Sequence, residues 1–540
     1  MENNNRTIIA IALVILLWSG YSIFFSPQPQ PVTSAPQSAV TEKQLEQTAP
    51  VSEGAQSVQP VTQMSAYVPV DYKERLVTVS SALFDIKIST TGAVVRAVTL
   101  KEYKETNAKD SAPFKLLELS DGRLATFKSS GSEGLSIPTD LPYVLSESSD
   151  NIFVEGEQKT VSFSATNAAG LTIVKNFTFY ADSYLVDVDV RLVNTGNTTS
   201  KGLFNLSLIY PWLSGDDDEG MQDMYSFVGP LSFDGEELLE DSPDDLQKSA
   251  KIYGNGIVWS GFAGKYFLAI MSPQDSAKQV QVQMGDGFVE NRFVSPFITL
   301  EPNQDISFKY TAFLGPKDYD LLLAGGHQFE QAKDYGFFSV LAKPLMHVLK
   351  FFYSYIGNYG FAIILLTVCI KIIFWPLTQK SYKSMKGMQK LQPQMQKMRE
   401  KYSNDKQRLN QEMMSFYKEN KVNPLGGCLP MLIQIPVFFA LYQVLLGAIE
   451  LRHAPFIFWL TDLSMKDPYY ITPIIMGGTM FIQQKMTPTN MDPTQAKIML
   501  MMPIVFTFLF LNFPSGLVIY WMVNNLLTIL QQYLIKRQPD

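Results

Sequence analysis

One lysine lies inside an apolar segment in the second half of the chain. The segment runs from Phe361 to Pro376, reads FAIILLTVCIKIIFWP, and contains Lys371. Counted back to Tyr353 it has about 24 residues, enough at about 1.5 Å per residue to cross a hydrocarbon layer about 30 Å thick. A charged side chain at the centre of a membrane helix costs about 2.5–3.5 kcal/mol, so Lys371 is a candidate functional residue.

Small and polar residues accompany Lys371 at helical spacing. Gly360, Thr367 and Thr378 share the face of Lys371 if the segment is a helix. This spacing favours a polar surface inside a membrane domain. A second interpretation also fits, because Lys371 is five residues from Pro376 and a long side chain can extend to the nearer membrane surface. The segment alone does not decide between the two.

A second polar stripe lies in the last apolar segment, Leu517 to Ile535. The stripe recurs every four residues and consists of Tyr520, Asn524, Thr528 and Gln532, with Trp521 and Asn525 beside it. Because polar side chains facing lipid are unfavourable, we expect the stripe to face the interior of a helical bundle. It can supply ordinary hydrogen bonds between helices, or it can line a water-filled groove together with Lys371 and Thr367.

A third apolar segment, Leu429 to Ile449, contributes two glutamines. Gln434 and Gln443 are nine residues apart, which is two and a half helical turns, so they face opposite directions. Only one of them can therefore lie beside Lys371.

The other reactive residues form no recognisable catalytic or metal site. Cys369 and Cys428 lie in or beside apolar segments, and His327, His347 and His453 lie far apart. The sequence has no phosphate-binding Gly-Lys-Ser/Thr loop, no Gly-x-Ser-x-Gly motif and no His-Glu-x-x-His motif. We therefore expect a protein that is not an enzyme and that has no cofactor, no bound metal and no specific nucleic-acid partner.

The first 64 residues divide into an apolar and a polar part. Thr7 to Phe25 contains no charge, exceeds the usual length of a signal-peptide core and ends without a small-x-small cleavage pattern. Residues 1–25 are therefore predicted to be a membrane anchor. Residues 26–64 are rich in Pro, Gln, Ser and Thr and poor in large apolar residues, which predicts a flexible tether.

Residues 65–320 show the alternation that is typical of β-strands. Apolar and polar residues alternate in many short runs, for example LVDVDVRL from Leu185. Many short strands predict a large antiparallel β-sandwich. Two acidic stretches, 215–220 and 234–245, are either solvated loops or a calcium site, and they lack EF-hand spacing.

Two helical regions flank the segment that contains Lys371. Residues 321–352 have aromatic residues on the apolar side of an amphipathic pattern, which predicts a helix along the membrane surface. Residues 379–422 carry eleven Lys and Arg against four acidic residues and predict a basic two-helix hairpin. Its methionines either pack the two helices together or offer an adaptable surface to apolar segments of other proteins. They are Met385, Met388, Met395 and Met398.

Six membrane spans are predicted in total. They are the anchor, the span at 353–378 and four apolar segments within 423–540. Two of these segments, 469–482 and 498–511, have fourteen residues each. A helix of that length covers about 21 Å, less than the hydrocarbon layer, so we expect the bilayer to be thinned beside them.

Charge distribution predicts the orientation. The region 26–349 carries 24 Lys and Arg against 41 Asp and Glu, a net charge of −17, whereas the loops of the C-terminal part are basic. The positive-inside rule places the basic hairpin and both termini in the cytoplasm and residues 26–350 outside.

Six motifs in the C-terminal part match the YidC/Oxa family of membrane protein insertases. They are Asn358-Tyr-Gly-Phe, Trp375-Pro-Leu-Thr, Leu391-Gln-Pro, Asn423-Pro-Leu-Gly-Gly-Cys-Leu-Pro, Asp467-Pro-Tyr-Tyr and Phe513-Pro-Ser-Gly-Leu-Val. The chain resembles the Gram-negative bacterial members, most strongly over residues 355–535. The resemblance implies an N-terminal anchor, a periplasmic β-supersandwich related to sugar-mutarotase folds, and a five-span helical core with a hydrophilic groove.

The resemblance also implies roles for single residues. Lys371 corresponds by position to the positive charge of the family's groove. The polar residues around that charge in the family correspond to Thr367, Gln434, Tyr520, Trp521 and Thr528. Asn524 lies on the same stripe of the last span. The chain departs from the family at the charge, where members usually carry arginine. A lysine can lose its proton in a dry site and an arginine does not, so we expect a groove wet enough to keep Lys371 charged.

The implied function is the insertion and chaperoning of nascent inner-membrane proteins, alone or with the Sec translocon and the ribosome, by a monomer in the bacterial inner membrane. Two alternatives come from other classes. One is an anion transporter or channel that uses Lys371, although no internal repeat of the kind common in transporters is visible. The other is a sugar-binding enzyme domain on a membrane base, but His327 and His347 fall after the predicted strands.

Overall fold

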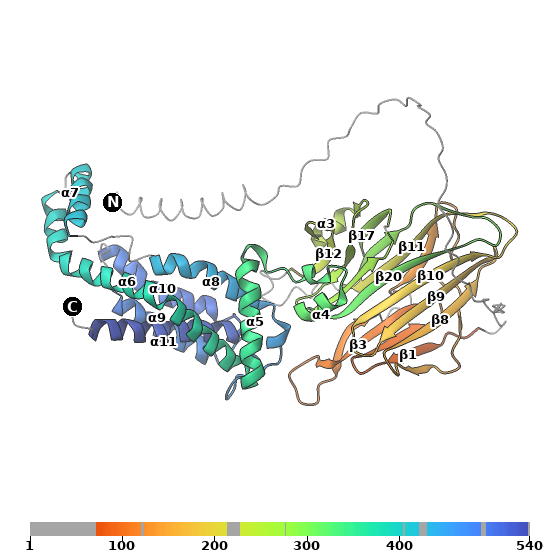
Figure 1. Cartoon of the computed structure of the whole chain (residues 1–540), viewed down its shortest axis with the longest axis horizontal. Helices are drawn as coiled ribbons and strands as arrows, with labels where there is room; N and C mark the ends of the chain where they lie inside the picture. Colours follow the sequence, from red (N-terminus) through yellow and green to blue (C-terminus); the bar gives the residue numbers. More distant parts are fainter. Residues whose placement is uncertain are drawn as a thin grey trace, which may run out of the picture. The chain divides into compact units, whose positions relative to one another are not determined.

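The computed structural model describes residues 72–119, 124–212, 227–275, 277–402, 405–420, 429–487 and 493–537. Four predicted features lie outside these residues: the anchor at 1–25, the tether at 26–64, the acidic stretch 215–220 and the motif at 423–428. Along the chain, the described residues form first a β domain and then a series of helices (Figure 1).

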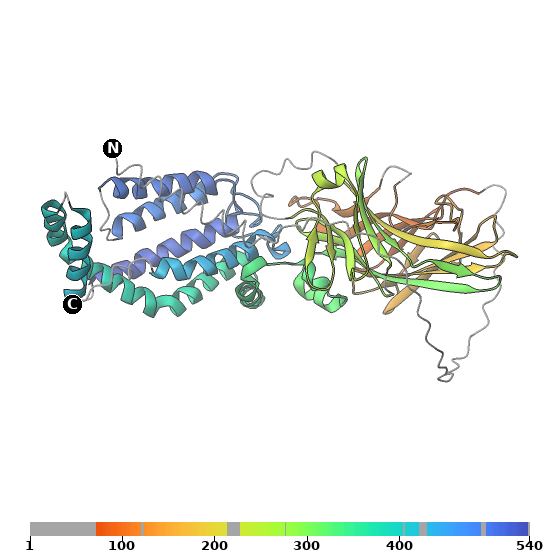
Figure 2. The ribbon, with the colours of Figure 1, turned by 90° about the horizontal axis from the view of Figure 1, so that it is seen from above.

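The β domain contains three sheets (Figures 1 and 2). The five-stranded sheet has the order β4 (Pro113–Glu118), β3 (Val94–Lys104), β2 (Phe84–Ser89), β1 (Leu76–Ser80) and β7 (Asn151–Phe153). The nine-stranded sheet has the order β13 (Leu238–Glu240), β12 (Gly229–Phe233), β15 (Trp259–Ala263), β16 (Phe267–Pro273), β20 (Asp305–Pro316), β10 (Leu185–Asn194), β9 (Leu171–Tyr180), β8 (Gln158–Thr166) and β6 (Val144–Leu145).

The six-stranded sheet includes β14 (Lys251–Tyr253), β17 (Gln279–Gly285), β18 (Phe288–Val294), β11 (Ser200–Pro211) and β19 (Ile298–Leu300), and β5 (Lys128–Ser132) pairs with β11. A short helix, α3 (Pro243–Lys248), lies between β13 and β14. The β1–β7 pair is parallel, and its neighbours in the sheet pair antiparallel. The predicted large β-sandwich is therefore confirmed.

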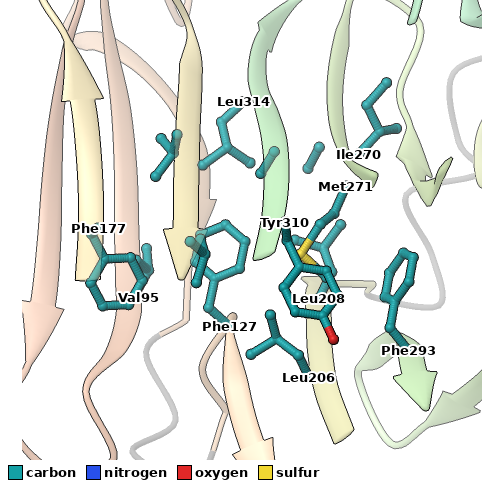
Figure 3. Close-up of a cluster of buried hydrophobic side chains, with 14 of the residues drawn as sticks. Val95, Phe127, Phe177, Leu206, Leu208, Ile270, Met271, Phe293, Tyr310 and Leu314 are labelled. Carbon is teal, nitrogen blue, oxygen red and sulfur yellow. The ribbon is translucent and has the colours of Figure 1, made fainter. Parts of the chain in front are cut away.

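Alternation along the long strands builds the core of the β domain. In β9 and β10 every second side chain is buried, which is the period of two that a strand with one covered face requires. Figure 3 shows part of this core, where Phe127, Phe177 and Tyr310 lie between the strands with aliphatic side chains such as Leu206 and Leu208.

A lysine occupies one of the inward positions of β9. Lys175 is fully buried, and its ammonium donates hydrogen bonds to the backbone carbonyls of Gly92 (3.0 Å), Ala93 (3.0 Å) and Phe127 (2.8 Å). Ala93 and Phe127 both have a left-handed backbone, with φ of 46° and 56°. The apolar side chains of the core offer no hydrogen-bond donor to these carbonyls of two loops, and the ammonium supplies the donors.

The buried position of Lys175 makes the stability of the β domain depend on pH. Burial lowers the pKa of Lys175 to about 7, well below that of the unfolded chain. Between pH 7 and 10 the unfolded state binds more protons at this residue, so the residue's contribution to the free energy of unfolding rises with pH. From pH 7 to pH 10, the free energy of unfolding of the native chain should therefore rise by about 1–3 kcal/mol relative to that of Lys175→Met.

Chemical unfolding of the purified full-length chain, followed by far-UV circular dichroism at several pH values, measures this difference. Lys87→Met, at an exposed position of β2, is the matched control and should show no such trend. A pH-independent difference for Lys175→Met would contradict the assignment of the effect to Lys175.

The rest of the described chain is helical. Its elements are α4 (Tyr319–Gly325), the 3₁₀ turns η2 (Phe329–Ala332) and η3 (Gly336–Phe338), α5 (Ser339–Ile356), α6 (Tyr359–Lys401), α7 (Lys406–Glu419), α8 (Leu429–Leu446), the 3₁₀ turn η5 (Ile449–Leu451), α9 (Ile471–Met486), α10 (Pro493–Phe510) and α11 (Ser515–Arg537). The helical bundle, by which we mean α5, α6 and α8–α11, has an apolar core of its own.

Two predicted helix boundaries are wrong. The region 321–352 is not one helix, because Gly326, His327 and Gln328 have positive φ values and separate α4 from the turns that precede α5. The membrane segment does not extend back to Tyr353. Gly357 is left-handed at the end of α5, and the Asn358 side chain accepts a hydrogen bond from the amide of Phe361 and caps a new helix.

The predicted division between the membrane span and the hairpin at residue 378 is not a break in the structure. Helix α6 is continuous over 43 residues and contains Pro376 and Pro393. The Thr378 hydroxyl lies 3.0 Å from the carbonyl oxygens of Phe374 and Trp375, next to Pro376. The first arm of the basic hairpin is therefore a direct extension of the helix that carries Lys371.

Apolar side chains lie exposed on the outside of the helices, as expected for contact with lipid. The most exposed include Ile372 and Ile373 of α6, Ile474 of α9, and Ile504 and Phe508 of α10. One helix of the described chain, Tyr359–Leu391, is long and apolar enough by itself to cross a membrane, and two shorter apolar helices are Gln434–Leu446 and Ile498–Phe510.

The helices are longer than the apolar runs on which the span lengths were predicted. Helix α9 has 16 residues and α10 has 18, whereas fourteen were predicted for each. Polar residues such as Gln483 continue α9 beyond its apolar run. The expected thinning of the bilayer therefore rests on apolar length alone and remains a prediction.

Candidate functional site: a polar path in the helical bundle

Lys371 points into the bundle toward the last helix. Its ammonium donates a hydrogen bond of 2.7 Å to the hydroxyl of Thr528 on α11, and this hydroxyl donates one of 2.7 Å to the backbone carbonyl of Asn524. Thr528 is buried and Lys371 is half-buried. Because the ammonium contacts α11, Lys371 points into the bundle, and its functional role remains a prediction.

Gln434 joins the same polar group from α8. Its side-chain amide donates a hydrogen bond of 2.8 Å to the Asn524 side chain, and it also lies in hydrogen-bonding contact with the Tyr520 hydroxyl. Gln443 lies elsewhere, beside Gly336. The two glutamines therefore lie in different parts of the bundle, as their spacing predicted, and a direct contact of Gln434 with Lys371 remains a prediction. We call Lys371, Thr528, Asn524, Gln434 and Tyr520 the polar path.

Two predicted groove residues have other partners. Thr367 is buried, but its hydroxyl donates to the carbonyl of Ile363 in its own helix at 2.7 Å. Trp521 packs in an aromatic cluster, with ring centroids 4.7 Å from Phe438 and 5.3 Å from Phe510. Neither residue therefore contributes a hydrogen bond to the polar path in this structure.

Sequence spacing missed one buried glutamine of α11. The Gln531 amide faces α6 and donates to the Thr378 hydroxyl at 2.6 Å. Gln532, which the spacing of four did predict, is also buried and donates to Tyr382 of α6 (3.1 Å) and to Thr487 (3.0 Å). Four residues advance a helix by about 40° more than one turn, so a spacing of four drifts away from the starting face. An alternation of three and four would have identified Gln531.

The methionines of the hairpin are mostly covered. Met385, Met388 and Met395 of α6 are buried, and Met398 is half-buried. This burial favours the interpretation in which they pack the helices together. The role of these four side chains in receiving apolar segments remains a prediction.

Helix α8, which carries Gln434, is attached to α5. Phe338, just before α5, stacks on Phe439 of α8 with centroids 5.7 Å apart. Beyond the end of α8, Glu450 has only 7% of its side chain exposed and lies 3.1 Å from the Lys350 ammonium of α5. The Lys333 ammonium lies 3.7 Å from the same carboxylate.

The ion cluster around Lys350 also includes the start of α4. Asp318 and Asp320 lie 3.0 and 2.7 Å from the Lys350 ammonium. Burial opposes the charge, but the carboxylates of Glu450, Asp320 and Asp318 together raise the pKa of Lys350 above its ordinary value. Lys350 therefore stays charged throughout the physiological pH range and ties three segments together.

The polar path supplies groups that form hydrogen bonds. Among the residues that the structure describes, no group of three His, Cys, Asp or Glu side chains lies close enough together to hold a metal ion. The polar path consists of an ammonium, amides and hydroxyls, which bind peptide groups and carboxylates through hydrogen bonds.

The sequence was compared with known families and proteins. Residues 76–348 match the family described as YidC periplasmic domain, and residues 351–540 match the family described as 60Kd inner membrane protein. A membrane protein insertase YidC from Geotalea daltonii is 43% identical and covers 99% of each chain. The chain belongs to the YidC family of membrane protein insertases.

A second relative agrees with this family. The membrane protein insertase YidC of Geobacter sulfurreducens is 44% identical and covers 98% of each chain. A crystal structure of an active YidC insertase covers 86% of this chain and 93% of its own, with 17% identity and a TM-score of 0.37. The β domain is thus the periplasmic domain of an inner-membrane YidC insertase, and the whole polar path lies in the region matched to the 60Kd inner membrane protein family.

The ion pair between Lys350 and Glu450 gives a testable prediction. Lys350→Met should lower the free energy of unfolding by about 1–3 kcal/mol, because it leaves Glu450 buried with only Lys333 nearby. The double variant Lys350→Met/Glu450→Gln should cost less than the sum of the two single variants.

Denaturant titration of the purified chain in detergent measures these energies. Lys343→Met on the same helix is the control, because Lys343 lies over the Tyr319 ring and should cost less than about 1 kcal/mol. Additive costs for the two single substitutions would show that the pair is not coupled.

Proposed function

We propose that the polar path is the working surface of a hydrophilic, positively charged intramembrane groove through which this YidC insertase inserts inner-membrane proteins and helps them fold. The observation that supports this proposal is the half-buried Lys371, whose ammonium lies within hydrogen-bonding distance of a second helix. Nascent membrane proteins are the clients. The groove is expected to be open to the cytoplasm and to lipid and closed toward the periplasm.

The energy for insertion comes from the client itself. A client helix of about 20 apolar residues gains about 0.3–0.6 kcal/mol per residue on entering lipid, or about 6–12 kcal/mol in total. The step that needs help is the passage of a short polar flank through the apolar layer. A groove that offers charge and hydrogen bonds lowers that barrier without nucleotide hydrolysis.

Each residue of the path has a defined part in this mechanism. The Lys371 ammonium has three N–H donors, and Thr528 takes one of them, so carboxylates and carbonyls of a client flank can accept from the others. Gln434 and Asn524 each offer an amide, which can donate to and accept from a peptide backbone. Tyr520 adds a hydroxyl beside Gln434.

We place the chain in the membrane with six spans, both termini and the hairpin in the cytoplasm, and residues 26–350 in the periplasm. The excess of basic residues in 379–422 supports this orientation. Because the first arm of the hairpin continues the helix of Lys371, it extends from the groove toward the source of nascent chains. The ribosome and the Sec translocon are the proposed partners in the transfer of nascent chains. The chain is proposed to work as a monomer.

The charge at residue 371 can be tested directly. Lys371→Glu should reduce insertion of a single-span client with an acidic flank at least about tenfold, because a negative groove repels the flank, whereas Lys371→Arg should retain insertion. Insertion is measured by protease protection in proteoliposomes and by growth of a depletion strain.

The control for this charge reversal lies outside the bundle. Lys466→Glu makes the same change at an exposed position between η5 and α9 and should leave insertion unchanged. Full insertion by Lys371→Glu would contradict a mechanism that depends on the groove charge.

Water access to the path gives a second test. With Cys369 and Cys428 replaced by serine, single cysteines at positions 367, 371 and 524 should react with a membrane-impermeant maleimide from the cytoplasmic side and not from the periplasmic side. The lipid-exposed Ile474→Cys is the control and should react from neither side. If all three positions are unreactive from both sides, the site is dry and the proposed groove is wrong.

A further inference from the structure

The inner end of the bundle carries hydrogen bonds that the polar path does not use. Gln531 of α11 donates to Thr378 of α6 at 2.6 Å, and Gln532 donates to Tyr382 of α6 at 3.1 Å and to Thr487, which follows α9, at 3.0 Å. We call these three bonds the inner clamp. They join α6, α9 and α11 between the polar path and the cytoplasmic ends of these helices.

The clamp residues are deeply buried. Gln531 is 1% exposed, Gln532 8% and Thr378 9%. An amide enclosed by a membrane bundle is costly unless it is hydrogen-bonded, so each of these side chains favours the one helix arrangement that pairs it. Apolar residues would fill the space without selecting an arrangement. The clamp therefore specifies how α6, α9 and α11 are positioned.

The clamp also stabilises α6 where its backbone is weakened. The ring of Pro376 removes one backbone hydrogen bond from the helix. Thr378 lies next to this point, with its hydroxyl 3.0 Å from the carbonyl oxygens of Phe374 and Trp375. Gln531 holds Thr378 from the side of α11. Five residues before Pro376, Lys371 donates to Thr528 of α11, so the clamp and the Lys371–Thr528 bond join the same two helices.

Helix α8 is held in a different way. It packs mainly against α5 and makes few contacts with α6 or α11. The link to α5 includes the stack of Phe338 on Phe439 and the close approach of Gly336 to Gln443. Toward α11, the Gln434–Asn524 hydrogen bond crosses the polar path. The path thus lies between α8, which is attached to α5, and the three helices that the clamp joins, α6, α9 and α11.

We propose that the groove opens on one side only. The inner clamp holds α6, α9 and α11 together as a fixed wall, and α8 moves away from this wall with α5, which breaks the Gln434–Asn524 bond and exposes Lys371 to the client. Gln531 and Gln532 are positioning residues that keep Lys371 and Thr528 in register during this motion. The inference rests on the proposed function of the polar path as a client groove.

Reversible crosslinks distinguish the two walls. In a chain with Cys369→Ser and Cys428→Ser, the pair Thr378→Cys/Gln531→Cys removes one bond of the fixed wall, and a short bifunctional methanethiosulfonate can replace it. Insertion of a single-span client should fall about two- to tenfold without the crosslinker, as expected for one lost buried hydrogen bond. It should recover when the crosslink forms. A clamp that only stabilised the fold would change the amount of folded protein and not insertion per folded molecule.

The opposite result is expected across the moving wall. Crosslinking Gln434→Cys to Asn524→Cys should abolish the insertion that this variant retains, and a reducing agent should restore it. A second pair, Phe438→Cys/Trp521→Cys, crosses the same boundary where the native rings are 4.7 Å apart and leaves the Gln434–Asn524 bond intact. It should respond to the crosslinker in the same way.

Each outcome bears on the proposal. Loss of insertion on crosslinking positions 378 and 531 would show that α6 and α11 must separate. Unchanged insertion by the same double variant without the crosslinker would show that the clamp does not position the groove. Normal insertion by chains crosslinked from α8 to α11 would show that α8 does not move. Lys371→Glu in the same background reports separately on the groove charge, so a failure of the one-sided opening can be told from a failure of the proposed function.

Discussion

The ammonium groups of three lysines in this chain lie among different numbers of acceptors. Lys175 donates to three backbone carbonyls, and Lys350 lies beside three carboxylates. Lys371 donates to one hydroxyl within the described part of the chain. A lysine with three donors and one acceptor has capacity for further partners, and in an apolar surrounding that capacity must be met by water or by a bound group.

The polar residues of the path pair with one another across the helices: Lys371 with Thr528, and Gln434 with Asn524. A polar client segment that enters can exchange these bonds for its own, so the number of hydrogen bonds changes little as it passes. Under the proposed function, exchange of this kind keeps the free-energy cost of both the entry and the release of a client small.

Periodicity in the sequence predicted the β domain well because a strand with one covered face must alternate. The same rule missed Lys175, since alternation treats a charged residue as outward and cannot see carbonyls brought from loops about 50 to 80 positions away in the chain. The start of α6 was also missed. It depends on the left-handed Gly357 and the cap at Asn358, which are local backbone features inside an otherwise suitable pattern.

The functional site was predictable to the extent that a helix keeps its polar residues on one side. Lys371, Gln434, Asn524 and Thr528 could be placed because burying polar groups away from lipid leaves few arrangements. The partner of each residue could not be predicted, because it depends on how helices far apart in sequence cross.

The choice of lysine at residue 371 agrees with this picture. An arginine presents five donors in a fixed plane and needs several acceptors around it, whereas an ammonium is compact and can turn its three donors toward whichever groups are present. The single hydroxyl of Thr528 suits the smaller group. With one acceptor supplied by the described part of the chain, the pairing of Lys371 is completed by water or, under the proposed function, by a polar group of the client, which connects the chemistry of one side chain to the passage of a client.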